Sequence, residues 1–404
     1  MTRSARDVQP GPPALVFGNG ITALGVQRIL AAAGIPYYTV DRTDPLVLRS
    51  RHYRALPATA GDPVPEGLAG WLQGLPLERA VLLPCSDIWV SSVAGLGPEV
   101  GARFPSSVAD QTAIDRLVDK ARFGETLARL EVPHPRSEIV ETKDDLESVL
   151  ETGFEGAFLK PRDSARFFRR FRCKAFRAET PDELASRLEQ VADAGLGVIA
   201  QEYIPGPPSN HYFIDGFRDA SGTVRALFAR RRLRMYPPAF GNSTLMRSVA
   251  ITEVAGAAES LQRLLAELRY RGVFSAEFKL DPRDQRFKLL EVNTRPWWYV
   301  DFAARCGVDV CSMAYRNALG GAVETVESYR IGVECVYPYM DLSACLALRR
   351  AGELSLTEWA RSWIGAQQPV FRWDDPWPAI AAVADLVGGK LSGSLHRGAR
   401  RMPS

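Results

Sequence analysis

The chain has 404 residues, of which 46% are hydrophobic and 24% charged, with a net charge of +3. These values are ordinary for a globular protein of two or three domains, and the small net charge does not argue for nucleic acid binding. The six cysteines form no Cys-x-x-Cys pair, and the four histidines lack the spacing of a zinc site. No apolar run approaches about 18 residues, so we expect no transmembrane segment and a reduced, cytoplasmic protein. Residues 1–13 are polar and proline-rich and are expected to be disordered.

Residues 14–105 alternate apolar strand patterns with helical patterns. Strands are expected at 14–17, 37–41 and 80–84, and a helix follows the first of them through Ala33. This alternation predicts a parallel sheet covered by helices, which is an N-terminal Rossmann-like domain.

A glycine motif lies between the first strand and its helix. Gly18-x-Gly20-x-x-Ala23, with Asp41 at the end of the next strand, matches the dinucleotide-binding fingerprint in form. Two interpretations stay open: a nicotinamide site, or glycines that only permit a tight strand-to-helix turn.

The next two segments are predicted to be a helical connector and a small α/β unit. In the connector, residues 106–135, Asp119 is expected to cap a helix beginning at Lys120. For residues 136–205 the patterns predict strands at 138–141, 156–160 and 198–202 and helices at 144–151 and 181–194.

A basic loop is expected between Lys160 and Lys174. This stretch contains seven cations, interleaved with Phe167, Phe168 and Phe171. The loop either holds a polyanion such as a triphosphate or is a solvated basic face with affinity for nucleic acid.

The most informative feature is a predicted pair of strands on either side of the turn at residues 281–286. Because strand side chains alternate, Glu291, Asn293 and Arg295 share one face of the second strand. A register with Glu277 opposite Glu291 brings both carboxylates to that face. Carboxylate and amide oxygens suit Mg²⁺, which takes one or two carboxylates plus phosphate oxygens. The alternative is an exposed hairpin whose charges face water.

The order and spacing of several motifs resemble the ATP-grasp superfamily of carboxylate–amine (or thiol) ligases. The resemblance covers roughly residues 14 to 320. The motifs are Asp119-Lys120…Pro133-x-Pro135, Leu159-Lys160-Pro161, Gln201-Glu202-Tyr203-Ile204-Pro205-Gly206, Glu277 and Glu291-x-Asn293-x-Arg295.

The resemblance implies a fold that is both α/β and α+β, with a two-lobed ATP-grasp domain after the N-terminal Rossmann-like domain of residues 14–105. Residues 136–205 would be the small lobe, and residues 206–325 the large lobe with the metal and catalytic site. Residues 326–404 are a C-terminal extension to which no role is assigned.

The resemblance also implies a role for each matching residue. Glu277, Glu291 and Asn293 are expected to hold Mg²⁺, or Mn²⁺ in its place. Arg295 and Lys174 are expected to be catalytic. The implied ATP-binding residues are Lys120, Lys160, Ser164, Gln201, Glu202, Tyr203, Ile204, His211 and Lys279.

One departure from the family concerns the stretch after Lys160, which contains no glycine from Arg162 to Lys174. The family commonly has a glycine-rich flap there. Without it, the binding of the phosphates would fall to Ser164, Arg166 and Lys174.

The implied activity is ATP-dependent amide or peptide bond formation through an acyl-phosphate, with release of ADP and phosphate. The substrates would be a small carboxylate and an amine, such as an amino acid, a peptide or a cell-envelope precursor; a homodimer is left open. At least one of Arg230, Arg231, Arg232 and Arg234 is expected to contact substrate, and residues 241–244 are expected to form a substrate loop.

Two other functions are retained as alternatives. One is an NAD(P)-dependent oxidoreductase that uses the Gly18 motif. The other is a non-catalytic ATP-binding regulator, which the glycine-free flap suggests. The basic segment at residues 395–401 is interpreted either as a ligand for an anionic surface or as a disordered end.

Overall fold

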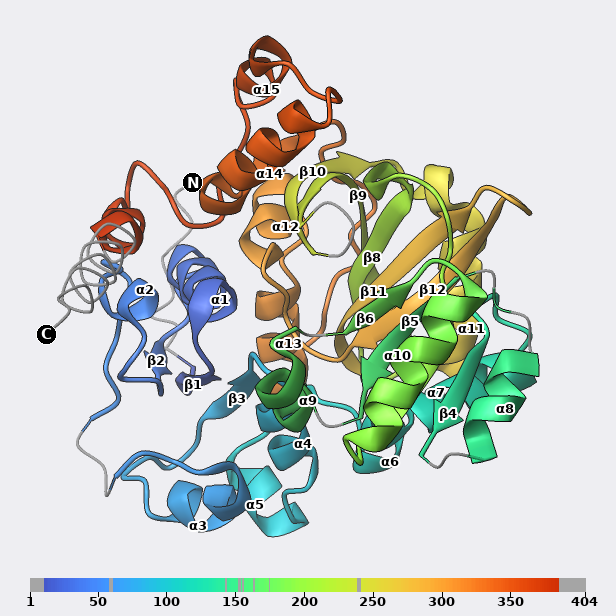
Figure 1. The fold of residues 1–404 in the computed structure, drawn as a ribbon. Helices are drawn as coiled ribbons and strands as arrows, with labels where there is room; N and C mark the ends of the chain where they lie inside the picture. Colours follow the sequence, from blue (N-terminus) through green and yellow to red (C-terminus); the bar gives the residue numbers. More distant parts are fainter. Residues whose placement is uncertain are drawn as a thin grey trace, which may run out of the picture.

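The computed structural model describes residues 11–57, 61–141, 144–151, 154, 156–162, 164–173, 175–237 and 241–384. Within these residues the chain forms three β-sheets and the helices that cover them (Figure 1). Among them we find no helix with the length and apolar character needed to span a bilayer.

The first sheet is parallel, as predicted, and has the strand order β2-β1-β3. Its strands are β1 (Ala14–Phe17), β2 (Tyr37–Thr39) and β3 (Val81–Pro84). The helices of this part are α1 (Gly20–Ala32), α2 (Pro45–Leu48), α3 (Leu68–Gln73), α4 (Asp87–Ala94) and α5 (Pro98–Arg103), with the 3₁₀ turn η1 (Pro65–Gly67). β1 and β3 contain only apolar residues and are buried throughout, which is typical of strands covered on both faces.

Two helices then lead to the second sheet. They are α6 (Gln111–Val118) and α7 (Lys120–Arg129). The predicted cap is present, because the Asp119 side chain accepts hydrogen bonds from the amides of Ala121 and Arg122.

The second sheet is antiparallel, with the order β4-β7-β5-β6. Its strands are β4 (Ser137–Val140), β5 (Ala157–Pro161), β6 (Phe176–Ala178) and β7 (Val198–Glu202). Its helices are α8 (Asp144–Glu151), α9 (Ser164–Phe171) and α10 (Pro181–Asp193).

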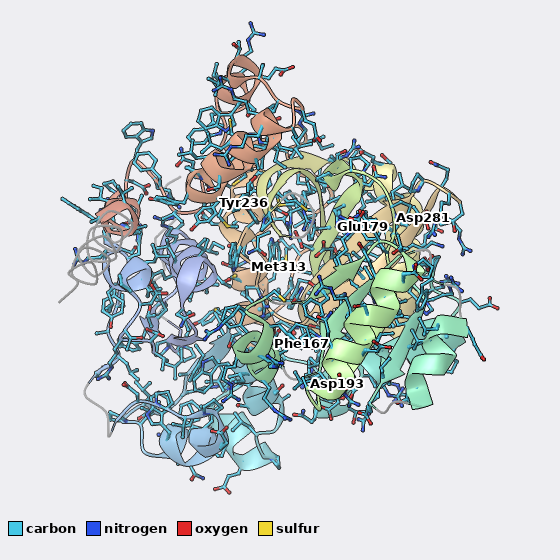
Figure 2. All side chains as sticks on the ribbon, viewed as in Figure 1. Phe167, Glu179, Asp193, Tyr236, Asp281 and Met313 are labelled. Atoms are coloured by element: carbon cyan, nitrogen blue, oxygen red, sulfur yellow. The ribbon has the colours of Figure 1, made fainter. Side chains whose placement is uncertain are left out.

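The prediction of a basic loop after Lys160 is wrong, because residues 164–171 form helix α9. Phe167 and Phe171 are four residues apart and pack on each other, with ring centroids 4.8 Å apart, and Phe167 is buried in the hydrophobic core beneath the second sheet. Figure 2 shows Phe167 on α9. The packing of these aromatic side chains, which are spaced for one face of a helix, therefore outweighs the repulsion between the arginines that separate them.

The third sheet has six strands in the order β12-β11-β8-β9-β10-β13, and all its pairings are antiparallel. The strands are β8 (His211–Arg218), β9 (Val224–Tyr236), β10 (Asn242–Val249), β11 (Gly272–Asp281), β12 (Arg286–Asn293) and β13 (Glu334–Val336). Its helices are α11 (Ala255–Glu267), α12 (Val300–Cys306) and α13 (Val310–Ala318), with the 3₁₀ turns η2 (Pro208–Asn210) and η3 (Ile251–Val254). Helix α1 packs on α12 and α13, and α13 contacts β8 and β11, so the N-terminal part and this sheet share a core (Figure 1).

The C-terminal extension is built into the large sheet rather than attached at its surface. Its strand β13 pairs with β10, and helices α14 (Pro338–Arg350) and α15 (Leu356–Arg361) follow. Asp341 of α14 is buried and accepts hydrogen bonds from Arg234 and Thr244 of the sheet and from the indoles of Trp359 and Trp363.

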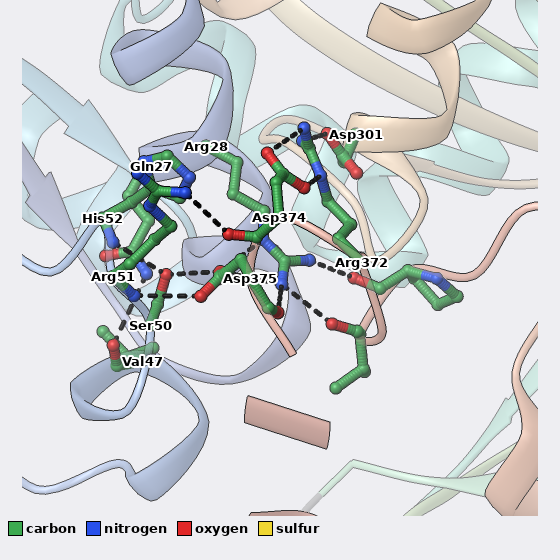
Figure 3. A network of polar contacts seen from close by, with 12 residues as sticks. Gln27, Arg28, Val47, Ser50, Arg51, His52, Asp301, Arg372, Asp374 and Asp375 are labelled. Atoms are coloured by element: carbon green, nitrogen blue, oxygen red, sulfur yellow. Dashed lines mark hydrogen bonds and ion pairs between the residues drawn. The ribbon is translucent and has the colours of Figure 1, made fainter. Parts of the chain in front are cut away.

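A second anchor joins the end of the described chain to the N-terminal part (Figure 3). The buried guanidinium of Arg28 donates to Asp375 at 2.9 Å and to the carbonyls of residues 369–370. The same carboxylate accepts from the Ser50 hydroxyl at 2.6 Å and from the Arg51 amide at 2.9 Å. Because both charges are buried and fully hydrogen bonded, this contact fixes the C-terminal segment on α1.

Candidate active site

A cavity of about 720 Å³ lies between the four-stranded and the six-stranded sheets. It brings together many residues that are distant in sequence. The predicted site residues that line it are Lys120, Lys160, Gln201, Glu202, Tyr203, Ile204, His211, Glu277, Lys279 and Glu291. The side chain of Ser164 and the whole of Lys174 lie outside the described residues.

The two predicted carboxylates face each other across adjacent strands. In the β11–β12 register Glu277 pairs with Glu291 and Ser275 with Asn293, so the predicted register is confirmed. A β-bulge follows Glu277, where the register shifts to Phe278 opposite Leu289. Directly opposed side chains have Cβ atoms about 4.5–5.5 Å apart, so both carboxylates can reach one ion.

The charges around the pair make the two carboxylates unequal. Glu277 accepts from Arg232 at 3.0 Å and from the Nδ1 of His211 at 2.8 Å. Burial acts to raise the pKa of Glu277, but Arg232, His211 and Lys160 outweigh it and lower this pKa to about 2. The low-polarity surroundings of the cleft and the charge of Glu277 raise the pKa of Glu291. Burial lowers the pKa of His211 to about 4, so His211 is neutral at pH 7.

This donor set fits a hard divalent cation that completes its shell with substrate oxygens. The charge of Glu277 disfavours ionisation of Glu291, and a cation between them removes that repulsion. The described residues contain no cluster of three or more His, Cys, Asp or Glu side chains suited to a metal. Mg²⁺ often binds through one or two carboxylates plus phosphate oxygens.

The side chain of Asn293 makes hydrogen bonds that differ from its predicted role as a metal ligand. Its amide nitrogen donates to Glu291 at 3.2 Å, and its amide oxygen accepts from Arg295 at 3.2 Å. The side chain thus links the carboxylate to the guanidinium, and a metal bond from its oxygen requires the amide to turn over. That role stays a prediction.

Arg295 lies just beyond β12 and is held by a residue that the sequence reasoning missed. Both oxygens of Asp87, at the start of α4, accept from its guanidinium, at 2.8 and 3.1 Å. Asp87 also lines a smaller cavity of about 240 Å³, together with Lys120, Lys160, Glu291 and Asn293. The available signal was its position after β3, since the carboxyl ends of parallel strands commonly form ligand sites.

The cationic side of the large cavity is formed by lysines from three different elements. Burial lowers the pKa of Lys160 on β5, and burial together with Lys160 lowers the pKa of Lys120 on α7. The ammonium of Lys279 on β11 lies 4.7 Å from the centroid of the Tyr203 ring. Glu202, at the end of β7, forms an ion pair with Arg283 at 2.7 Å.

No family model matches the chain. The chain is 26% identical over 228 residues to a D-aspartate ligase of Enterococcus faecium (strain Aus0004), a match that covers 54% of this chain and 53% of that protein. The chain thus spans about half the length of this curated relative.

Among solved structures, the chain resembles the biotin carboxylase domain of the Hydrogenobacter thermophilus 2-oxoglutarate carboxylase, with a TM-score of 0.61 and 17% identity over 80% of this chain and 73% of that one. It also resembles an N5-carboxyaminoimidazole synthetase of Staphylococcus aureus, with a TM-score of 0.60, 14% identity and 80% and 81% coverage. A phosphoribosylglycinamide synthetase of Anaerococcus prevotii has a TM-score of 0.59, 14% identity and 80% and 79% coverage.

The likeness to these solved structures shows that the chain shares their fold. The predicted mixed α/β fold is confirmed at this level, whereas the Rossmann-like character of the N-terminal part and the domain boundaries stay predictions.

The four clustered arginines of β9 have separate partners. Arg230 forms a buried ion pair with Asp215, and Arg234 is bound to Asp341. Arg231 lies on the opposite face of β9, where its guanidinium donates to the Ser209 carbonyl. Of the four, Arg232 alone lines the cavity among the described residues.

The end of the cavity near Arg232 is lined by residues that the sequence reasoning did not assign. These are Met235, Tyr236, Pro237, Gly241, Asn242 and Met340. Tyr236 is labelled in Figure 2, beside the C-terminal extension. Met340 belongs to α14, so the extension forms part of this wall. The predicted substrate loop at 241–244 is instead mostly the start of β10, with Ser243 bonded to Arg232 and Thr244 to Asp341.

The groups of the glycine motif in the N-terminal part form hydrogen bonds within the protein itself. Gly18 and Gly20 both have positive φ, which the tight turn into α1 requires. The Gly20 amide donates to the carboxylate of Asp44, and Asp41 accepts from the amides of Thr43 and Asp44. A carboxylate at the start of α1 disfavours a pyrophosphate there, so the tight-turn interpretation is favoured over a nicotinamide site.

Proposed function

We propose that this protein is an ATP-dependent carboxylate–amine ligase that works through an acyl-phosphate. The observation that carries the proposal is the opposed Glu277–Glu291 pair, in one cavity with Lys120 and Lys160. Two acidic side chains and two cations around a cleft of this size suit a triphosphate with its metal ion.

ATP and Mg²⁺ are the proposed cosubstrate and metal. The structures that the chain resembles include one in complex with MgADP and one in complex with ADP. Here Glu277 and Glu291 would hold the metal, which when bound offsets negative charge on the phosphate oxygens. Residues 201–204 and Lys160 would bind the nucleotide, and the N-terminal Rossmann-like domain would complete the site through Asp87.

The proposed reaction has two steps. A carboxylate oxygen of the first substrate attacks the γ-phosphorus of ATP, the bond from this phosphorus to the β–γ bridging oxygen breaks, and ADP leaves. The amine nitrogen then attacks the carbonyl carbon of the acyl-phosphate, phosphate leaves, and the nitrogen loses a proton to solvent. Arg295, held in place by Asp87 and Asn293, stabilises charge on the acyl-phosphate and on the tetrahedral intermediate.

The proposed carboxylate substrate is an amino acid, and D-aspartate is the first candidate because of the similarity to a D-aspartate ligase. The proposed amine belongs to a peptide or a cell-envelope precursor. Arg232 is the proposed contact for the carboxylate end of a substrate, because a guanidinium pairs with two carboxylate oxygens at once. A homodimer remains part of the proposal.

The test is phosphate release from ATP in the presence of Mg²⁺, D-aspartate or other amino acids, and a panel of amines. Release is expected only when both a carboxylate and an amine are present. Glu291→Gln is expected to lower kcat about 100-fold or more, because one anionic oxygen ligand is lost. Asp284→Asn, in the turn of the same hairpin and away from the cavity, is the matched control and is expected to keep full activity.

Other outcomes distinguish the alternatives. Tight ATP binding without phosphate release for any substrate pair would support a non-catalytic regulator. Saturable NAD(P) binding without ATP binding would replace the ligase by an oxidoreductase. Full turnover by Glu291→Gln would contradict the metal site.

A further inference from the structure

One end of the large cavity is lined by side chains without charge. Met235 and Tyr236 line it from the end of β9, Asn242 from the start of β10 and Met340 from α14. Arg232, three residues before Met235, lies at the border with the charged part of the cavity. These four uncharged residues are called the neutral end below.

The neutral end is held in place by one buried carboxylate. Asp341, next to Met340 in the chain, accepts hydrogen bonds from Arg234 at 2.8 Å and from Thr244 at 2.7 Å. Arg234 and Thr244 belong to β9 and β10, the two strands that carry the other residues of the neutral end. Figure 1 shows α14 beside these strands, which it contacts. The hydrogen bonds of Asp341 thus fix all three elements, so the neutral end is a preformed wall of the cavity.

Two hydrogen-bonding side chains of this wall are available to a ligand. Tyr236 and Asn242 are direct partners in the β9–β10 register, so their side chains lie on the same face. Among the described residues, neither the Tyr236 hydroxyl nor the Asn242 amide has a hydrogen-bond partner. The sulfur of Met235 accepts from Arg232 at 3.4 Å. A hydroxyl and an amide in an otherwise apolar wall suit an uncharged ligand that has amide groups of its own.

The distance from the carboxylate pair limits what can reach the neutral end. Three steps between neighbouring strands separate β11, which carries Glu277, from β10. At about 4.8 Å for each step, they span about 14 Å. An extended chain covers roughly 3.3–3.6 Å per residue, so a ligand that reacts near Glu277 and contacts Asn242 is about three or four residues long.

We propose that the neutral end binds the amine substrate, and that this substrate is the amino end of an uncharged peptide chain. This inference rests on the ligase activity proposed above, in which ATP and its metal use the lysines and the carboxylate pair, and a substrate carboxylate uses Arg232. The amine is the reactant that remains, and the neutral end is the described part of the cavity that no other reactant uses. Because Met340 belongs to the C-terminal extension, the extension takes part in selecting the amine.

The first experiment compares two amines that differ by a single charge, L-trialanine and its C-terminal amide, in the presence of ATP, Mg²⁺ and D-aspartate. A carboxylate loses its hydration in a neutral wall without gaining a cationic partner. We therefore expect kcat/KM for the trialanine amide to exceed that for trialanine by about 10-fold or more. The readout is phosphate release at varied concentrations of each peptide.

The second experiment changes the wall itself. Met340→Arg places a guanidinium there and should shift the ratio of the two kcat/KM values about 10-fold or more towards trialanine. A merely structural role of Met340 would lower both values by the same factor. Leu346→Arg, on the same helix at a position that is 47% exposed and outside the cavity, is the matched control and should leave the ratio unchanged.

A second variant covers the case in which Met340→Arg lowers the unfolding midpoint. Asn242 is exposed, so Asn242→Ala removes its amide with little effect on folding. The lost hydrogen bond should lower kcat/KM for the trialanine amide about 3- to 10-fold. An unchanged value for this variant would contradict a contact between Asn242 and the amine substrate.

Hydroxylamine separates a failure of this inference from a failure of the ligase. It attacks an acyl-phosphate directly, releasing phosphate, so ATP with D-aspartate or another amino acid should give a hydroxamate without any peptide. Absence of the hydroxamate from the original chain contradicts the ligase itself. If the hydroxamate forms, three results overturn the inference: neither peptide is used, both are used equally, or Met340→Arg changes both by the same factor.

Discussion

At the scale of single residues, the cleft changes the charge state of the side chains it contains. Lys279 is the clearest case, because it is buried beside Tyr203 and faces other cations. Burial, with the charges of Arg232 and Arg177, lowers its pKa to about 8. Its ammonium therefore loses its proton within the range in which enzymes are assayed, whereas an ordinary lysine stays charged.

This pKa predicts a pH dependence of nucleotide use. A protonated Lys279 attracts the phosphates of ATP, so kcat/KM for ATP is expected to fall as pH rises through about 8. Lys279→Arg keeps its charge at all these pH values and should remove the fall. Initial rates between about pH 6.5 and 9.5 test this expectation. A profile for the original chain that is flat above pH 8, or one that Lys279→Arg leaves unchanged, contradicts it.

At the scale of elements, the C-terminal extension depends on one buried carboxylate. Asp341 accepts from Arg234 and Thr244 on two strands and from Trp359 and Trp363 beyond α14. Arg234 and the other donors lower the pKa of Asp341 against the effect of burial, so it is ionised at neutral pH. The hydrogen bonds of this one side chain thus hold α14 against the sheet and place Met340 in the wall of the cavity.

Removing this carboxylate is expected to destabilise the protein strongly. Asp341→Ala leaves Arg234 buried without its partner, which typically lowers the free energy of unfolding by about 3–5 kcal/mol. Urea titration followed by tryptophan fluorescence measures the change. Glu353→Ala, at an exposed position in the same extension, is the control and should change the free energy by less than about 0.5 kcal/mol. A loss below about 1 kcal/mol for Asp341→Ala would show that the carboxylate does not hold the extension.

At the scale of the whole molecule, the candidate site is completed by a contact between two parts of the chain that are distant in sequence. Asp87 and Arg295 are 208 residues apart, and their ion pair joins the N-terminal part to the end of β12. Both side chains are partly exposed, so the pair adds at most about 1 kcal/mol to stability. Its importance is in the orientation of the guanidinium.

Asp87→Ala is therefore expected to affect catalysis far more than stability. Without the carboxylate the Arg295 guanidinium is free to rotate, and kcat/KM should fall about 10- to 100-fold while the unfolding midpoint stays within a few degrees. Asp87→Glu, which keeps the charge, should recover part of the loss. Steady-state kinetics for the ligase reaction, with thermal unfolding of the same samples, tests this. Equal losses of activity and stability would assign Asp87 a purely structural role.

Local patterns in the sequence were enough to predict much of the fold. The alternation of β11 and β12 around a Pro- and Asp-containing turn predicted the register of Glu277 with Glu291, which the structure has. The cap at Asp119 was also predictable, since it depends only on residues that are near in sequence. The helix α9 was missed because several charged residues concealed the spacing of Phe167 and Phe171.

By itself, then, the amino-acid sequence determined the strands of the first sheet, three of the four strands of the second sheet and the hairpin with its pair of carboxylates, because these follow from neighbours within one turn or hairpin. Only the tertiary structure decided that Asp87 holds Arg295, that Arg232 alone of its cluster meets the cavity among the described residues, and that Asp341 anchors the extension. Such contacts join residues far apart in the chain. They depend on how helices and sheets pack in three dimensions, which no local pattern encodes.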